Sequence, residues 1–257
     1  MKITLLQTDI KWSDPSANRR EAERLMEQAE RSDLFVLPEM WTTGFATDPE
    51  GVAEVAGNEQ GMTDTSEWMQ SMAQKHDAAI AGSVATKLPD GTFRNRFLFV
   101  TPDDMYHYDK HHLFTYGGEN KHYKAGNERT IAEWRGVRFL LQVCYDLRFP
   151  VFSRNRDDYD VALYVANWPE SRRRVWDTLL MARAIENQCY VIGVNRVGDD
   201  PQCHYNGGTA VIDAYGRIVA QATDNAQQSV TATLNMEKLK LFREKFPVLA
   251  DRDKTPL

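Results

Sequence analysis

The sequence predicts a single α/β domain in which two mixed β-sheets are packed between helices. Segments with strand-like apolar patterns alternate with segments of helical periodicity along all 257 residues. Turn signals at Asp90-Gly91 and Arg135-Gly136 place antiparallel hairpins among these βα units. The chain shows no linker, internal repeat or low-complexity segment, so we expect one domain over residues 1–257.

The first half of the chain begins with a strand over residues 2–9. Asp14 and Pro15 then predict a helix that runs to about residue 30, since Asp caps helices and Pro fits their first turn. Pro38 stops a short buried strand. The other elements expected in this half are a helix over 65–76 and strands over 33–37, 79–86, 93–101 and 105–110.

Residues 113–128 follow as a loop rich in Gly, His and Tyr, and loops of this length are often functional. The second half contains helices near 150–157, over 170–188 and over 236–246, and strands over 129–134, 137–144, 160–167, 190–197, 209–213, 217–222 and 230–234. The helix over 170–188 has the strongest periodicity, with an apolar stripe of Val175, Leu179, Ala182 and Ile185.

Composition restricts the partners and the location of the protein. The net charge of -6 argues against nucleic acid or an anionic membrane as a partner, since both bind basic surfaces. The one basic run, at 172–174, is interpreted as a solvated helix face. No apolar stretch approaches the roughly 18 residues of a membrane span, and the N-terminus lacks the features of a signal peptide. Three widely spaced cysteines argue against a disulfide framework and predict a reducing, cytoplasmic location.

Cys144 ends an apolar strand, and the residues after it are polar and charged. A helix can begin near Pro150, so the cysteine stands on a sharp strand-to-helix turn that exposes its sulfur at the carboxyl edge of a sheet. Nucleophile elbows use this geometry. Because a cysteine at this place can equally be a buried core residue, its assignment as a nucleophile requires a base and an oxyanion-stabilising group nearby.

Three further charged residues lie at or beyond strand ends: Glu39, Lys110 and Glu119. If their strands are neighbours in a sheet, the side chains converge with Cys144 on one pocket. Glu39 would then act as general base, and Lys110 would favour the thiolate and stabilise an oxyanion. Glu119 would orient Lys110 or help to transfer protons. Taken singly, the glutamates can be solvated loop residues and Lys110 the partner in a surface ion pair.

Three segments resemble motifs of the nitrilase, or carbon–nitrogen hydrolase, superfamily, in the order and spacing found there. They are LPEM at 37–40, YDKHHLF at 108–114 and VCYDLRFP at 143–150. The resemblance covers nearly the whole chain, and the three motifs together are highly specific although each alone is weak. It implies a Glu–Lys–Cys triad and a second glutamate, which match Glu39, Lys110, Cys144 and Glu119.

The resemblance also implies a fold and a chemistry. The implied fold is a four-layer αββα sandwich with mixed β-sheets. The implied chemistry is hydrolysis of a non-peptide C–N bond through a cysteine thioester, with no metal and no organic cofactor. Members of the superfamily commonly form dimers through helices beside their active sites, so the helices near 150–157 and over 170–188 would form a homodimer interface here.

Within the superfamily, the chain is most similar to the bacterial omega-amidase branch. The segments that carry this similarity are PEMWTTGF at 38–45, HYKAGN at 122–127, LYVANWP at 163–169, ARAIENQ at 182–188 and REKFP at 243–247. That branch hydrolyses the terminal amide of 2-oxoglutaramate or 2-oxosuccinamate to the 2-oxo acid and ammonia. Tyr145 follows the cysteine where true nitrilases usually have Trp, which favours an amide over a nitrile as substrate.

A small carboxylated amide requires a cationic or N–H-rich end to its pocket. Arg148 is one candidate for that role, and the alternative for Arg148 is an ion pair that fixes the turn at Cys144. Other candidates can either line the pocket or pack as core and rim residues. They are Tyr145, Phe45, Tyr116, Asn167 and Trp168.

The sequence leaves some other functions open and disfavours others. N-carbamoyl hydrolysis and deaminated-glutathione hydrolysis stay open as related activities, and a non-catalytic binding protein with this fold is the second class. A metal enzyme is disfavoured, since adjacent His111 and His112 lack ligand spacing and the chain has no HExxH or paired Cys-x-x-Cys motif. A papain-like signature around the cysteine is absent, and Gly207-Gly208 is too short to cradle a phosphate.

Overall fold

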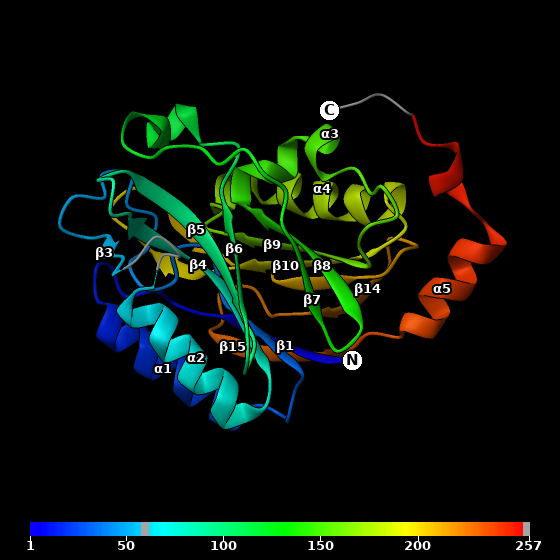
Figure 1. The fold of residues 1–257 in the computed structure, drawn as a ribbon, viewed down its shortest axis with the longest axis horizontal. Coiled ribbons are helices and arrows are strands. Elements are labelled where there is room, and N and C mark those ends of the chain that lie inside the picture. The colour runs from blue at the N-terminus through cyan, green and yellow to red at the C-terminus, as the bar shows by residue number, and fades with distance from the viewer. Residues whose placement is uncertain (58–61, 254–257) are drawn as a thin grey trace.

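A computed structural model describes residues 1–57 and 62–253. Its helices and sheets form the four layers that the resemblance implies (Figure 1). α1 (Pro15–Gln28) and α2 (Asp64–His76) cover the outer face of one sheet, and α4 (Arg173–Glu186) covers the outer face of the other. The short α3 (Pro150–Ser153) lies near α4, and α5 (Met236–Lys245) lies at the edge of the layers.

Within the described residues, one sheet has seven strands and the other has six. The first sheet has the order β15 (Gln228–Thr233), β1 (Lys2–Gln7), β2 (Leu34–Val36), β4 (Ala79–Lys87), β5 (Phe93–Val100) and β6 (Met105–Asp109), with β3 (Glu54–Val55) paired to β4. The second has the order β14 (Ile218–Gln221), β13 (Ala210–Ile212), β10 (Tyr190–Asn195), β9 (Val161–Ala166), β8 (Val137–Val143) and β7 (Ile131–Trp134). A separate hairpin is formed by β11 (Val197–Asp199) and β12 (His204–Asn206). Short 3₁₀ helices are found at Thr115–Gly117, Glu119–Lys121, Cys144–Arg148, Glu170–Arg172 and Val248–Asp251.

Both sheets are mixed, as expected. β1, β2 and β4 run parallel to one another, whereas β5 and β6 continue the first sheet as antiparallel strands. In the second sheet, β8, β9 and β10 are parallel, and antiparallel strands flank them on both sides. The parallel strands therefore occupy the middle of each sheet, where helices cover their outer faces.

Successive side chains of a strand point to opposite faces of its sheet, so the apolar residues of one strand contribute to two different cores. In β2, Leu34 and Val36 belong to the core between the two sheets, whereas Phe35 belongs to the core beneath α1 and α2. In β8, Phe139 faces the other sheet and Leu140 faces α4. Apolar clusters thus fill all three interfaces between the four layers, and burial of this surface from water stabilises the stack.

Most of the predicted elements are present, with small shifts at their ends. Asp14 caps α1 by accepting a hydrogen bond from the N–H of Ala17 at 2.9 Å. Sequence analysis did not predict β3 or the β11–β12 hairpin, because strands this short have no readable period. Across residues 1–57 and 62–253, every helix is too short or too polar to span a bilayer.

The helix expected near 150–157 is shorter in the structure. α3 ends at Ser153 because the Asn155 side chain forms hydrogen bonds with backbone groups outside the helix, which compete with continuation of the helix. Its amide donates hydrogen bonds to the carbonyl oxygens of Tyr159 and Asn187, at 3.1 Å and 3.0 Å. These contacts direct the chain away from the helix and toward β9.

Only part of the apolar stripe predicted on α4 packs on the sheet: Val175 and Leu179 are partly buried against the core beneath the helix. Trp176, Leu180 and Ala184 fill the core beneath the helix, whereas Ile185 from the predicted stripe is 50% exposed. Gly193 in β10 permits this packing, because a Cβ there would overlap Leu180 and Trp176. The aromatic and aliphatic side chains with i, i+4, i+8 spacing therefore determine which face of the helix is buried.

Candidate active site

Glu39, Lys110, Glu119 and Cys144 meet in the structure, although their strands are not neighbours in one sheet. β2 and β6, which precede Glu39 and Lys110, lie in the first sheet with β4 and β5 between them. β8, which precedes Cys144, lies in the second sheet. The assumed adjacency is therefore wrong, and the residues converge because the two sheets face each other.

Lys110 is the centre of a buried cluster of charges. Its Nζ donates to Glu39 Oε1 at 2.9 Å and to Glu119 at 2.9 Å and 3.1 Å. All three side chains are inaccessible to solvent. Removal of any one partner would leave a buried charge without compensation, which is strongly unfavourable. Each member of the cluster therefore stabilises the other two.

Neutral donors also bind the two carboxylates. Asn95 Nδ2 donates to Glu39 Oε1 at 2.8 Å and to Glu119 Oε1 at 3.0 Å. The backbone N–H of Asn167 donates to Glu39 Oε2 at 2.9 Å, and that of Phe114 donates to Glu119 Oε2 at 2.6 Å. Each of the four carboxylate oxygens thus has a donor, which fixes both groups around the ammonium.

The electrostatics of this cluster keep Lys110 charged and Cys144 protonated. Burial alone would lower the pKa of Lys110, but Glu119 and Glu39 outweigh burial and raise this pKa. Burial and the Glu39 carboxylate raise the pKa of the Cys144 thiol well above its usual value. Lys110 acts on the thiol in the opposite direction, as expected, but its effect is outweighed. The resting nucleophile is therefore a neutral thiol beside the Glu39 carboxylate.

The second glutamate has a perturbed acidity as well. Burial raises the pKa of Glu119, while the charge of Lys110 opposes that change. The Glu119 side chain is fully buried and does not contact solvent. It therefore contributes negative charge beside the ammonium and, together with Glu39, holds Lys110 in place.

Cys144 lies on a strained turn that Asp146 stabilises. The backbone φ of Cys144 is +45°, in the left-handed region that costs a residue with a Cβ about 1–2 kcal/mol. Asp146 Oδ2 accepts hydrogen bonds from the Val143 N–H at 2.9 Å and the Tyr108 hydroxyl at 2.8 Å. Its Oδ1 accepts from the N–H of His112 at 2.9 Å. One buried carboxylate thus connects the cysteine turn to the chain on either side of Lys110.

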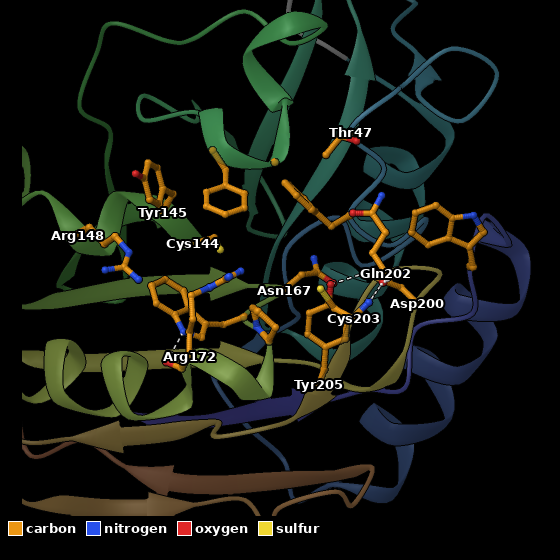
Figure 2. Close-up of a pocket in the computed structure, with 16 residues that line it drawn as sticks. Thr47, Cys144, Tyr145, Arg148, Asn167, Arg172, Asp200, Gln202, Cys203 and Tyr205 are labelled. Carbon is orange, nitrogen blue, oxygen red and sulfur yellow. Dashed lines mark hydrogen bonds between the residues drawn. The ribbon is translucent and has the colours of Figure 1, made fainter.

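The sulfur of Cys144 faces a cleft that opens to solvent (Figure 2). Five of the six proposed substrate-binding residues line this cleft. They are Phe45, Tyr145, Arg148, Asn167 and Trp168. Aromatic rings and polar side chains both line the cleft, as in pockets for small molecules.

Tyr116, the sixth proposed residue, is not among the described residues that line the cleft. Its ring is 88% exposed and packs against Phe114 with 5.8 Å between the ring centroids. The 3₁₀ turn at Thr115–Gly117 directs this side chain outward, so that Phe114 lines the cleft instead. A single turn of 3₁₀ helix in an aperiodic loop is not readable from the sequence.

Arg148 does not form the ion pair that was considered for it. Within the described ranges, no carboxylate lies within ion-pair distance of its guanidinium, whose Cζ lies 5.2 Å from the ring centroid of Trp168. The nearest carboxylate in sequence, Asp146, is already occupied by Tyr108 and His112. Arg148 therefore presents unpaired donors to the cleft.

Comparison with known proteins identifies the family. Residues 2–244 match the family model described as carbon-nitrogen hydrolase. The chain belongs to the carbon–nitrogen hydrolase family. Omega-amidase YafV of Yersinia enterocolitica is 51% identical over 256 residues, which cover 99% of this chain and 97% of that relative. The 2-oxoglutaramate amidase of Bacillus subtilis (strain 168) is 35% identical over 254 residues, with 97% and 96% covered.

Solved structures of this superfamily have the same fold as this carbon–nitrogen hydrolase. XC1258 from Xanthomonas campestris, a CN-hydrolase superfamily protein with an arsenic adduct in its active site, is 43% identical with a TM-score of 0.93. The alignment covers 100% of this chain and 98% of that one. Nit3 of Saccharomyces cerevisiae, a nitrilase-superfamily member, is 24% identical with a TM-score of 0.85 over 96% and 94% of the two chains. The predicted fold class and superfamily are therefore confirmed.

Sequence analysis of this carbon–nitrogen hydrolase missed Arg172. The basic run at 172–174 predicts a solvated helix face, yet Arg172 lines the cleft. The next residue, Arg173, pairs with Asp177 and Asp224, both at 2.8 Å. One signal would have found Arg172: β9 is the parallel neighbour of β8, so residues just after β9 emerge beside the cysteine turn.

A second missed group comes from the β11–β12 hairpin. Asp200, Cys203 and Tyr205 line the cleft, together with Trp12 from the loop after β1. The Tyr205 hydroxyl donates to Asp200 Oδ2 at 2.5 Å, which fixes the turn of this hairpin to its second strand. The adjacent His204 does not act together with Cys203, since its ring contacts Asp199 at 2.8 Å instead. In residues 1–57 and 62–253, no three His, Cys, Asp or Glu side chains are grouped as metal ligands.

Proposed function

We propose that this enzyme hydrolyses the terminal amide of small 2-oxo dicarboxylic acid monoamides, namely 2-oxoglutaramate and 2-oxosuccinamate. The products are the 2-oxo dicarboxylate and ammonia. The observation that carries the proposal is the buried cluster of Glu39, Lys110 and Glu119 against the thiol of Cys144, at the base of a cleft with unpaired guanidinium groups. Similarity to an omega-amidase and to a 2-oxoglutaramate amidase supports the choice of substrate.

The first half of the reaction forms a thioester. Glu39 accepts the proton of the Cys144 thiol as the sulfur bonds to the amide carbon. The negative charge that develops on the amide oxygen is stabilised by the Lys110 ammonium and by backbone N–H groups after the cysteine. Glu39 then returns its proton to the leaving nitrogen, the C–N bond breaks, and ammonia departs.

The second half of the reaction hydrolyses the thioester. Water replaces ammonia in the cleft and loses a proton to Glu39 as its oxygen bonds to the thioester carbon. Lys110 stabilises the second oxyanion in the same position. The C–S bond breaks, the sulfur regains its proton, and the free carboxylate leaves. Glu119 keeps Lys110 charged and oriented throughout, through its contacts of 2.9 Å and 3.1 Å.

Arg148 fits the role of binding the substrate carboxylate. It lines the cleft, it has no protein carboxylate within ion-pair distance in the described residues, and it is stacked on Trp168. A guanidinium is suited to a carboxylate because its planar donors match the two oxygens. Phe45, Tyr145 and Asn167 would surround the short carbon chain between this carboxylate and the amide.

An ammonia assay tests the proposal. The purified protein is incubated with 2-oxoglutaramate and with 2-oxosuccinamate, and with an N-carbamoyl amino acid and deaminated glutathione for comparison. Cys144→Ala should abolish ammonia release, whereas Cys189→Ala, at a buried thiol in the core beneath α4, should retain it. Lack of ammonia from both 2-oxo acid amides would remove the substrate assignment. Ammonia release that survives Cys144→Ala would remove the nucleophile assignment.

We also propose that two copies of the chain pair through the outer face of α4. Met181 and Ile185 on this face are 38% and 50% exposed, and Gly216 lies against both. The adjacent Tyr215 is 54% exposed and its ring lies 4.1 Å from that of Phe242 in α5. An apolar surface thus continues from α4 to α5, and a second copy of the same surface would cover it.

A cytoplasmic location is proposed for this enzyme, and one domain over residues 1–257. All three cysteines are free thiols in the structure. The proposed mechanism requires a reduced sulfur at Cys144, which a reducing compartment maintains. The family model spans residues 2–244 without interruption, which supports a single domain.

A further inference from the structure

A second unpaired guanidinium faces the cleft beside Arg148. Arg172 lines the same cleft, and both side chains extend toward the region around Cys144 in Figure 2. Neither guanidinium forms an ion pair or a hydrogen bond with a side chain or backbone group in the described ranges. The adjacent Arg173, in contrast, is paired with Asp177 and Asp224.

Aromatic rings hold both guanidinium groups in place. Arg148 Cζ lies 5.2 Å from the Trp168 ring centroid, and Arg172 Cζ lies 5.4 Å from that of Phe114. Trp168 Nε1 also donates to the backbone oxygen of Arg172 at 2.8 Å, so one indole contacts both arginines. Stacking of this kind fixes a guanidinium while its N–H groups stay available to a ligand.

The carboxylate nearest to this wall in the cleft is already occupied. Asp200 Oδ1 accepts hydrogen bonds from the N–H groups of Gln202 and Cys203, both at 2.7 Å, and Oδ2 accepts one from Tyr205. The wall with the two arginines therefore has two positive charges without a bound counter-ion from the protein. The buried cluster at the base of the cleft has the opposite balance, with two carboxylates around one ammonium.

This separation of charge selects a ligand with one anionic end and one neutral end. A neutral amide can approach the base of the cleft, where a carboxylate would be repelled by Glu39 and Glu119. The anionic end then lies against the two guanidinium groups. One guanidinium can bind a carboxylate in bidentate fashion, so a second one is left to donate to an oxygen next to that carboxylate.

We infer that Arg172 is a specificity-determining residue that acts with Arg148 to bind a carboxylate together with an adjoining electron-rich oxygen, such as a 2-oxo group. This inference rests on the proposed function and deepens it by assigning the recognition of the 2-oxo acid end. Arg148 and Arg172 together form the acid-binding site, and the preference for a 2-oxo acid over a simple carboxylic acid depends on Arg172.

Calorimetric titration of a catalytically inactive protein tests this assignment directly. Three ligands are titrated into Cys144→Ala: 2-oxoglutaramate, glutaramate, which lacks the 2-oxo group, and pentanamide, which also lacks the carboxylate. Adding Arg172→Met should weaken binding of 2-oxoglutaramate about 10- to 100-fold, the cost of losing a charge-assisted contact. It should weaken glutaramate less and leave pentanamide unchanged.

A matched control comes from the same basic run. Arg174 is exposed on α4, so Arg174→Met should change no affinity. The contact from Trp168 goes to the backbone of residue 172 and is retained in Arg172→Met, and the melting temperature verifies that the variant is folded.

The outcomes separate this inference from the proposed function. If the wild type releases ammonia but Arg172→Met binds 2-oxoglutaramate as tightly as before, the inference is overturned and the proposed function stands. Equal weakening for all three ligands would show a structural role and would overturn it too. If the wild type releases no ammonia, the proposed function fails, while a selective loss of 2-oxoglutaramate binding still supports the acid-binding site.

Discussion

At the scale of single residues, Glu39 has two effects on the cysteine that act in opposite directions. Its negative charge raises the pKa of the Cys144 thiol, and its free lone pair offers the thiol proton an acceptor. The sulfur therefore stays protonated and neutral until a substrate binds. This arrangement differs from thiol enzymes in which a neighbouring positive charge maintains a thiolate at rest.

Glu39→Gln should therefore make the cysteine more acidic while it abolishes turnover. Because Glu39 raises the pKa of Cys144, its removal lowers that pKa, and the thiolate forms at lower pH than in the wild type. The measurement is ultraviolet absorbance of the thiolate against pH, with a Cys144→Ala background subtracted. A midpoint that is unchanged or moves to higher pH would contradict the charge balance described here.

Lys110→Met should lower kcat about 100- to 1,000-fold, the usual cost of losing one oxyanion-stabilising donor. KM should change much less, because the ammonium contributes most after charge develops on the substrate oxygen. Steady-state kinetics with 2-oxoglutaramate measure both. An increase in KM as large as the decrease in kcat would assign Lys110 to substrate binding instead.

Some residues of the site were predictable and others were not. Cys144, Glu39 and Lys110 follow strands that end abruptly, and this signal can be read from local sequence. Asn95 was missed because a polar residue in the middle of a strand has no local signature, and only its contacts with Glu39 and Glu119 reveal it. Arg172 was missed because its surroundings depend on strand order.

At the scale of elements, the turn after β8 is held by the chain that leaves β6. Asp146 contacts Val143 on its own turn and Tyr108 and His112 on either side of Lys110. The nucleophile and the ammonium are therefore positioned by one shared carboxylate rather than by two independent loops. This connection crosses from one sheet to the other.

Asp146→Ala should destabilise the fold by about 3–5 kcal/mol, because it leaves several buried donors without an acceptor. Denaturant unfolding measures this loss. Asp104→Ala, in the exposed turn before β6, is the matched control and should change stability by less than about 0.5 kcal/mol. Similar small effects for both variants would mean that Asp146 does not hold the turn.

Some helices and strands can be predicted from local sequence signals alone. The Asp14 cap and the hairpin turn at Asp90-Gly91 are local signals, and both α1 and the β4–β5 pair are present as predicted. The length of α3 depends instead on Asn155, whose partners at Tyr159 and Asn187 lie beyond the helix. Helical periodicity cannot detect a competitor of that kind.

At the scale of the whole molecule, the site exists because two sheets face each other. Each sheet contributes part of the catalytic set, and the core between them fixes the distance between these parts. The sequence predicted two packed sheets, but it could not show that Glu39 and Cys144 belong to different ones. Pairing between strands far apart in the chain is a property of the assembled fold.

Pairing of two copies is testable at this scale. Ile185→Asp places a charge in the exposed apolar surface of α4 and should convert a dimer into a monomer. Light scattering coupled to size-exclusion chromatography measures the mass. Val55→Asp, at a 70% exposed position in β3, should leave the mass unchanged. A wild-type protein that is already monomeric would refute the proposed interface.

The most direct test of the account is to trap the acyl group on Cys144. Acid quenching during turnover of 2-oxoglutaramate, followed by mass spectrometry of the peptide that contains Cys144, should show an added mass equal to the substrate minus ammonia. The adduct should be absent from Cys144→Ala. Ammonia release by the wild type with no adduct on Cys144, or with the adduct on another residue, would contradict the assignment of this thiol as the nucleophile.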